Sequence, residues 1–179
     1  MSDLAHTTID PAEIERFSRI AAEWWDPAGK FAPLHRLNPV RIGYIRDQAA
    51  LHWQRDPLSG SPLTGLSVLD IGCGGGLLCE PMVRLGANVT GLDASERNIR
   101  VAALHAEGQA LSIDYRQDTA EACVATGRQY DIVLALEIVD PGGPALTPGA
   151  RAAVAEAVRA AIRIAREIQG SPGEGSSDA

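Results

Sequence analysis

The sequence has few cysteines, and no two of them stand at metal-binding or redox spacing. Cys73, Cys79 and Cys123 form no CxxC pair, and their number is odd. A disulfide framework needs paired cysteines, and a structural zinc site needs closely spaced ligands. We therefore expect neither, and the cysteine usage favours a reducing, cytoplasmic location.

The sequence also has fewer basic than acidic residues. The chain has 16 Lys and Arg residues against 23 Asp and Glu residues, a formal net charge of -7, and no basic cluster interrupts this acidic balance. Binding to a nucleic-acid backbone depends largely on Lys and Arg side chains that neutralise phosphates. We therefore expect no nucleic-acid partner.

Long apolar runs are missing as well. No run approaches the roughly 18 apolar residues of a membrane-spanning helix, and the first residues, MSDLAHTTIDPAEIE, have neither the basic start nor the apolar centre of an export signal. Neither export nor membrane spanning is expected, although peripheral contact with a bilayer stays open. With 179 residues, 45% of them apolar and 22% charged, the chain suits one globular domain with a sizeable core.

A glycine-rich turn follows a short apolar strand in the segment VLDIGCGGG, residues 68–76. Gly72, Gly74 and Gly76 permit positive φ and close approach of the backbone to a ligand. The helix expected over residues 77–85 would direct its free N–H groups toward that ligand. Each glycine alone is equally typical of an ordinary turn, but the strand, the glycines and the helix together predict a cradle for a nucleotide-type cofactor.

The spacing of the glycines separates two classes of cofactor. The dinucleotide fingerprint requires a glycine where Leu77 stands, so that template fails at this position. Asp70 followed by a glycine at every second place instead resembles motif I of the S-adenosylmethionine-dependent methyltransferases. Asp93 ends the next expected strand, where a carboxylate can accept hydrogen bonds from both ribose hydroxyls.

Apolar periodicity and turn residues predict an alternation of helices and strands. A first helix begins at Pro11 and ends before Asp26, a second opens at Asn38-Pro39, and a linker covers residues 56–65. The expected strands cover residues 67–71, 88–92, 112–116 and 132–136, and the expected helices between them cover 77–85, 96–107 and 119–125. This order predicts a parallel sheet with crossover helices.

Four regions follow from this pattern. We expect an N-terminal helical segment over residues 1–58, a cofactor-binding α/β core over 66–139, an amphipathic helix over 147–169 and a disordered tail over 170–179.

Three strings carry a narrower resemblance: ERFSRIAAEWWDPAGKFAPLHRLNPVRIGYI, VLDIGCGGGLLCEPMVRLGANVTGLDAS and YDIVLALEIV. Over about residues 9–139 the chain resembles the ubiquinone-biosynthesis O-methyltransferases, the 3-demethylubiquinone 3-O-methyltransferase family. The string WWD followed by PLHRLNPVR is more specific than the glycine turn, which methyltransferases of many substrates share.

The resemblance implies a set of cofactor-binding residues for S-adenosyl-L-methionine. Arg41 would pair with the methionyl carboxylate, and Asp93 would hold the ribose. Asp118 would read the adenine edge, and Leu136 would flank the adenosine. The backbone of Gly72 and Gly74 would lie beside the cofactor. Simpler roles stay open for three of them: a surface salt bridge for Arg41, a solvated loop position for Asp118 and core packing for Leu136.

The sequence departs from the family at the end where the reaction takes place. The family pattern, an acidic residue followed by a Glu-His pair, resembles a divalent metal site. Here Glu137 keeps the first position and Asp140 can stand for the second, but Pro141 replaces the histidine. Two carboxylates can still hold Mg²⁺ together with water. Glu137 is also the candidate catalytic base, whereas the simpler alternative is a strand-end Glu and a turn-opening Asp.

The resemblance implies an α/β fold of the S-adenosylmethionine-dependent methyltransferase (Rossmann-like) class with N-terminal helices. The family sheet of seven strands, ordered 3-2-1-4-5-7-6, would be truncated after the fourth strand to 3-2-1-4. Residues 132–136 would then form an open edge, which favours dimerisation or aggregation, and a homo-oligomer is one way to cover it. The abrupt change of composition after Val139 suggests the hypothesis of a truncated or frame-shifted gene.

Two classes of function follow. The first is methyl transfer to a lipid-tailed catechol, a polyprenylated demethylubiquinone intermediate, in the cytoplasm or at the periphery of the inner membrane. The second is a truncated, catalytically inactive cofactor-binding remnant or interaction subunit. An NAD-linked oxidoreductase is a third class, disfavoured by Leu77 and by the lack of a second substrate domain.

Overall fold

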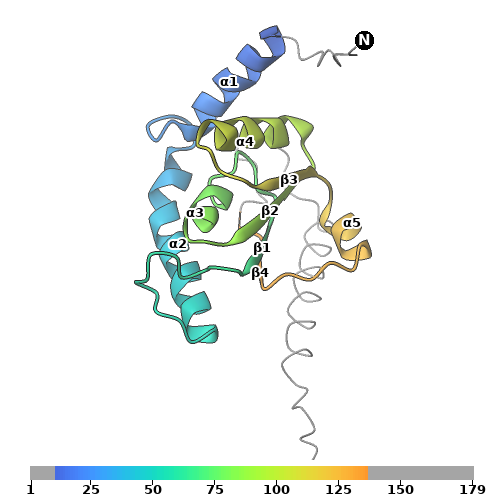
Figure 1. Cartoon of the computed structure of the whole chain (residues 1–179). Coiled ribbons are helices and arrows are strands. Elements are labelled where there is room, and N and C mark those ends of the chain that lie inside the picture. The colour runs from blue at the N-terminus through green and yellow to red at the C-terminus, as the bar shows by residue number, and fades with distance from the viewer. Residues whose placement is uncertain (1–10, 137–179) are drawn as a thin grey trace, which may run out of the picture.

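The computed structural model describes residues 11–136, with side chains from residue 15 onward. The helix predicted over 147–169 and the tail over 170–179 lie outside these residues. The described elements are, in chain order, α1 (Pro11–Trp25), α2 (Ala32–His52), β1 (Ser67–Ile71), α3 (Cys79–Arg84), β2 (Asn88–Asp93), α4 (Glu96–Gly108), β3 (Asp114–Gln117), α5 (Ala120–Ala125) and β4 (Ile132–Leu134). Figure 1 shows the four strands side by side with helices around them.

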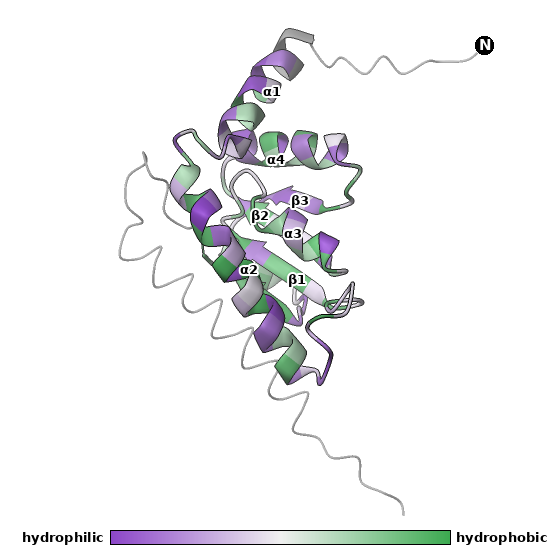
Figure 2. Ribbon diagram, turned by 90° about the vertical axis from the view of Figure 1, so that its left-hand side faces the viewer, coloured by the Kyte–Doolittle hydropathy of each residue, from purple (hydrophilic) through white to green (hydrophobic). Residues whose placement is uncertain are grey.

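The strands form one parallel sheet in the order β3-β2-β1-β4, as the sequence predicted. Val68 of the central strand is in register with Val89 of β2 on one side and with Ile132 of β4 on the other. Figure 2 shows β1 mostly in the green of hydrophobic residues, whereas the outer strand β3 is purple. A central parallel strand is buried on both faces, so the apolar strand belongs in the middle.

Alternate residues of β1 contribute to two separate hydrophobic clusters. On one face, Val68 packs with residues of α2 and α3, including Ile45 and Met82. On the other face, Leu69 and Ile71 pack with residues of α5 such as Ala120 and Cys123. Because successive side chains of a strand point to opposite faces, one apolar run supplies both layers of the core.

The starts of β1 and β4 are joined by a reciprocal pair of side chains. The backbone N–H and the hydroxyl of Ser67 both donate to Oδ2 of Asp131, each at 2.7 Å. The backbone N–H of Asp131 in turn lies 3.0 Å from Oγ of Ser67. These bonds fix the register of β4 on β1 at the end of the sheet opposite the glycine turn.

The second helix begins seven residues earlier than predicted. It starts at Ala32, with Pro33 in its first turn, and Pro39 lies inside it. Asn38 is no helix cap: its side chain is buried and donates from Nδ2 to the carbonyl oxygen of Leu77 at 3.1 Å. The pair Asn38-Pro39 resembles a cap followed by the first helical residue, but the proline at the start of this helix is Pro33. Ile45 and Ala49 lie on the inward face of this helix and are buried.

Other element limits differ by a few residues. β3 begins at Asp114 rather than at residue 112, and β4 ends at Leu134 rather than at residue 136. Within residues 11–136, no helix is both long enough and apolar enough to cross a membrane.

Candidate functional site

The turn between β1 and α3 has the backbone that the glycines predicted. Gly72, Gly74 and Gly76 have φ values of 73°, 54° and 87°, a region that side-chain-bearing residues rarely occupy. The N–H groups of Gly72 and Cys73 both donate to the carbonyl oxygen of Leu92, at 2.8 and 2.9 Å. The turn is therefore held against the carboxyl end of β2.

Asp93 lies directly beside this turn. Its Oδ2 accepts a hydrogen bond from the backbone N–H of Gly74 at 3.0 Å. Its Oδ1 accepts from the N–H of Ser95 at 2.8 Å and from Nδ2 of Asn98 at 3.2 Å. The carboxylate is only partly buried. These bonds fix its orientation while oxygen lone pairs remain for a ligand that approaches from solvent.

Tyr115 of β3 fills the space beneath the turn. A Cβ atom on Gly76 would collide with the hydroxyl of Tyr115, and one on Gly91 would lie 2.7 Å from its ring. The hydroxyl is buried without a hydrogen-bond partner among the described residues. Burial, followed by the nearby Cys79 and Cys73, raises the pKa of Tyr115 far above its ordinary value, so the phenol stays neutral. Two glycines therefore make room for one aromatic ring.

The thiols of Cys73 in the turn and Cys79 at the start of α3 are both buried. Sγ of Cys79 donates to Oδ2 of Asp70 at 3.3 Å. A hydrogen bond with Cys73, burial and the negative charge of Asp70 raise the pKa of Cys79 well above its usual value. The hydrogen bond with Cys79 lowers the pKa of Cys73, but burial and the charges of Asp70 and Asp93 outweigh it, so that the pKa of Cys73 is raised. Neither thiol is a nucleophile at neutral pH.

Two tryptophans at the end of α1 contact the glycine turn. A Cβ atom on Gly74 or on Gly75 would lie 2.7 Å from the ring of Trp24, so this ring covers the turn. Nε1 of Trp25 donates to the carbonyl oxygen of Gly75 at 3.1 Å. The ring of Trp24 also stacks on Phe31, with centroids 3.9 Å apart. Sequence reasoning used WWD as a family signature and gave these residues no role at the site.

Arg41 lies on α2, three residues after Asn38. Residues three apart on a helix share a face, and the side chain of Asn38 reaches the carbonyl of Leu77, the first residue after the glycines. The structure therefore brings the segment of α2 that carries Arg41 to the turn, and Arg41 itself is half-buried.

Asp118 and Leu136 follow the ends of β3 and β4. The backbone N–H of Asp118 donates to the carbonyl oxygen of Asp93 at 3.2 Å, and its Oδ1 accepts from the N–H of Thr119 at 2.8 Å. Leu136 is 45% exposed. The carboxyl ends of parallel strands meet at one edge of a sheet, so both residues share the edge of the glycine turn.

The predicted catalytic and metal residues Glu137 and Asp140 lie outside the described residues. Between residues 15 and 136, no group of three or more His, Cys, Asp and Glu side chains could hold a metal ion.

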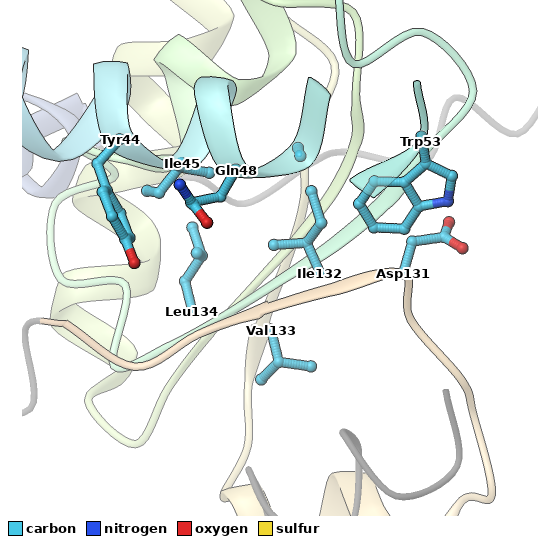
Figure 3. Close-up of a pocket in the computed structure, with 9 residues that line it drawn as sticks. Tyr44, Ile45, Gln48, Trp53, Asp131, Ile132, Val133 and Leu134 are labelled. Carbon is cyan, nitrogen blue, oxygen red and sulfur yellow. The ribbon is translucent and has the colours of Figure 1, made fainter. Parts of the chain in front are cut away.

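A hollow lies between α2 and β4, away from the glycine turn. It encloses about 300 Å³ and is lined by Tyr44, Ile45, Gln48, Ala49, Trp53 and residues 131–134. Figure 3 shows Ile132 and Leu134 pointing toward α2, whereas Val133 points away from it. None of its lining residues belongs to the turn, so the hollow and the glycine turn are separate features.

The turn and Asp93 fit a nucleoside-type ligand better than a dinucleotide. The carboxylate is oriented by the turn itself, as a ribose acceptor must be, and residue 77, where the dinucleotide pattern needs a third glycine, is a buried leucine. At positive φ, Gly72, Gly74 and Gly76 add no side chains of their own to the turn, and the rings of Trp24 and Tyr115 pack against it from other elements.

Comparison with curated proteins finds ubiquinone biosynthesis O-methyltransferases. The chain is 60% identical over 140 residues to that of Sinorhizobium medicae (strain WSM419) and 58% identical over 140 residues to that of Brucella ovis (strain ATCC 25840 / 63/290 / NCTC 10512). Each match covers 78% of this chain and 56% of the relative. The chain thus spans little more than half the length of these relatives.

Comparison with solved structures finds the same fold. The magnesium protoporphyrin IX methyltransferase from Synechocystis PCC 6803, solved with bound SAM, matches with a TM-score of 0.56 and 22% identity, over 86% of this chain and 73% of that one. The profile of the family described as "Methyltransferase domain" matches residues 68–162, more than half of the chain. It covers the glycine turn and Asp93, and it extends past Val139. Together with the fold, this match means that the chain belongs to the methyltransferase-domain family.

Proposed function

We propose that the protein is an S-adenosyl-L-methionine-dependent O-methyltransferase that methylates a catechol oxygen of a polyprenylated intermediate in ubiquinone biosynthesis. The observation that carries the proposal is the carboxylate of Asp93, held by the N–H of Gly74 at the mouth of the glycine turn. The relatives named above support the reaction and the substrate class.

The cofactor-binding residues of this proposal are those expected from the sequence. Asp93 would accept the ribose hydroxyls, and Gly72 and Gly74 would give the cofactor access to the backbone. Arg41 would pair with the carboxylate of the methionyl group. Asp118 and Leu136, which follow the neighbouring strands, would contact the adenine and the adenosine.

The bound cofactor would supply a methyl group activated on a sulfonium sulfur, which becomes a neutral thioether when the sulfur–methyl bond breaks. Methyl transfer to oxygen requires alignment above all, and the fixed turn and Asp93 would provide it. The catechol hydroxyl must lose its proton as its oxygen becomes bonded to the methyl carbon, and Glu137 would take that proton. In the alternative to this role as base, Glu137 would hold Mg²⁺ together with Asp140, and the ion would lower the pKa of the hydroxyl. Both carboxylates suit this hard cation, although Pro141 offers it no ligand.

For partners and location, we propose a cytoplasmic protein that meets its lipid-tailed substrate at the periphery of the inner membrane. A homo-oligomer is part of this proposal, because β4 is the last strand on its side of the described sheet.

The alternative is a cofactor-binding remnant or interaction subunit without catalysis. It is favoured by Pro141, which stands in the place of the family's histidine. Both functions share binding of the cofactor.

Two experiments test and separate these functions. Calorimetric titration with S-adenosylmethionine should give a dissociation constant in the micromolar range, on the order of -8 kcal/mol. Absence of binding would contradict both proposed functions, because both require the cofactor. Transfer of a labelled methyl group to a soluble catechol with a short isoprenoid tail then separates them, because only the enzyme forms product. Repeating the assay with EDTA, and with EDTA followed by excess Mg²⁺, tests the metal.

A further inference from the structure

The carbonyl group of Gly75 is held from outside the turn. Its oxygen accepts the indole N–H of Trp25 at 3.1 Å, and the N–H of Gly76, in the same peptide unit, donates to the carbonyl oxygen of Cys73 at 3.0 Å. A peptide unit is planar, so these two bonds fix its orientation completely. Glycine residues impose little orientation of their own, and this makes the outside contact important.

The indole of Trp25 is itself held by α4. Its ring stacks face to face on His105, with centroids 3.9 Å apart and planes 4° from parallel. Nδ1 of His105 lies 2.5 Å from Oε1 of Glu80. The stack keeps Trp25 in one orientation, and Glu80 keeps His105 in one orientation.

Glu80 links this chain of contacts back to the turn. Its side chain is fully buried, and its second carboxylate oxygen accepts a hydrogen bond from Arg84 at 3.1 Å. A buried carboxylate is tolerated only when partners satisfy it, so His105 and Arg84 are required contacts. The backbone N–H of Glu80 donates to the carbonyl oxygen of Gly76 at 3.2 Å. The contacts thus form a closed ring from Gly75 through Trp25, His105 and Glu80 to Gly76.

We propose that Trp25 is a positioning residue for cofactor binding. Its indole N–H, aligned by His105 and Glu80, orients the Gly75–Gly76 peptide of the turn on which the cofactor would lie. The inference rests on the proposed cofactor binding, and it assigns a role to one tryptophan of the pair. The other, Trp24, covers Gly74 and Gly75 through its ring and makes no such bond to the turn carbonyl.

Trp25→Phe tests the role of the indole N–H. Phenylalanine keeps an aromatic ring against His105 but has no donor for the carbonyl of Gly75. We expect S-adenosylhomocysteine, used as a stable probe, to bind about fivefold to tenfold more weakly by calorimetry, the loss typical of one hydrogen bond. Trp53→Phe is the matched control, because Trp53 packs beside the hollow between α2 and β4. It should leave the affinity unchanged.

The comparison of affinity with stability separates positioning from support of the fold. In the expected result, Trp25→Phe melts within a few degrees of Trp53→Phe yet binds the probe more weakly. Equal affinity of Trp25→Phe and wild type overturns the inference. If the wild-type protein does not bind the probe, the proposed function fails as well. If the wild-type protein and Trp25→Phe bind it equally well, only the inference about Trp25 fails.

A measurement on the wild-type protein decides the matter if Trp25→Phe does not fold. The three indole N–H groups can be followed by ¹⁵N NMR, with Trp24→Phe and Trp53→Phe to assign the signals by elimination. The indole signal of Trp25 should shift when S-adenosylhomocysteine is added, and that of Trp53 should stay in place. An unshifted Trp25 signal in a protein that binds the probe overturns the inference.

Discussion

The edge of the sheet that carries the glycine turn and the β4 side of the sheet are built differently. At the carboxyl ends of β1 and β2, the glycine turn is held by backbone bonds from Leu92, by the carboxylate of Asp93 and by the tryptophans of α1. On the other side, β4 has three residues, of which Ile132 and Val133 are half-buried, and it borders an open hollow. The edge with the glycine turn is therefore held by contacts from α1, β2 and the turn itself, whereas the β4 side consists of one strand of three residues paired with β1 alone.

The largest effect is expected where the turn meets Tyr115. Gly76→Ala places a side chain at φ 87° and into the hydroxyl of Tyr115. Backbone strain and overpacking together should lower the free energy of unfolding by about 2–4 kcal/mol. Chemical denaturation measures the loss, and cofactor binding should fall with it.

Tyr115→Phe is the control that sharpens this prediction. The hydroxyl of Tyr115 has no hydrogen-bond partner among the described residues, so its removal alone should change stability by less than about 1 kcal/mol. In the Gly76→Ala background it should restore part of the loss. If the two changes simply add, the collision with Tyr115 is not the cause.

Asp93→Asn should affect cofactor binding more than folding. The amide has one acceptor oxygen in place of two and no charge, so its NH2 group would face either the N–H of Gly74 or that of Ser95, and a ribose would lose a charged acceptor. We expect S-adenosylmethionine to bind about 10- to 100-fold more weakly, as for charged hydrogen bonds. Calorimetry checks this. Asp114→Asn, the same change on an exposed carboxylate of β3, should leave affinity unaltered; an equal loss in both would point to net charge instead.

On the β4 side, Asp131→Ala should lower stability by about 1 kcal/mol, because the hydrogen bonds to Ser67 are partly open to solvent. Affinity for the cofactor should stay the same, since these bonds lie at the far end of the strands. A double-mutant cycle with Ser67→Ala should show that the two losses overlap. A large drop in cofactor affinity would contradict the separation of the two sides.

The smallest effect is expected at the rim of the hollow. Tyr44 is 67% exposed, so Tyr44→Ala should change the free energy of unfolding by less than about 0.5 kcal/mol. Its neighbour Ile45 is buried, and Ile45→Ala should cost about 2–4 kcal/mol. Thermal unfolding of the two variants checks the contrast, and a large loss for Tyr44→Ala would mean that something packs on this rim.

Local sequence pattern predicted the core strands and the backbone of the turn well. β1 covers the predicted residues because its apolar run and its glycines act locally. The start of α2 was missed because Asn38-Pro39 imitates a helix start, whereas Asn38 makes a long-range contact with Leu77. A cap and a buried amide look alike in sequence.

The contacts of the tryptophans could not be predicted in the same way. Trp25 and Gly75 are 50 residues apart, and no periodicity links an indole to a turn carbonyl. Two adjacent tryptophans at a helix end were the available signal. The cofactor roles of Asp93 and Arg41 stay predictions, and so do those of Glu137 and Asp140 beyond the described residues.

The position of β1 at the centre of the sheet has a consequence for assembly during synthesis. Its pairing with β2 closes a short crossover, but its pairing with β4 joins Ser67 to Asp131, 64 residues further along. Closing the longer loop costs more chain entropy. As the chain leaves the ribosome, β1 can pair with β2 before β4 has been synthesised. Until β4 pairs, the other edge of β1 has unpaired backbone groups and apolar side chains beside it, and a chaperone would protect this edge from aggregation.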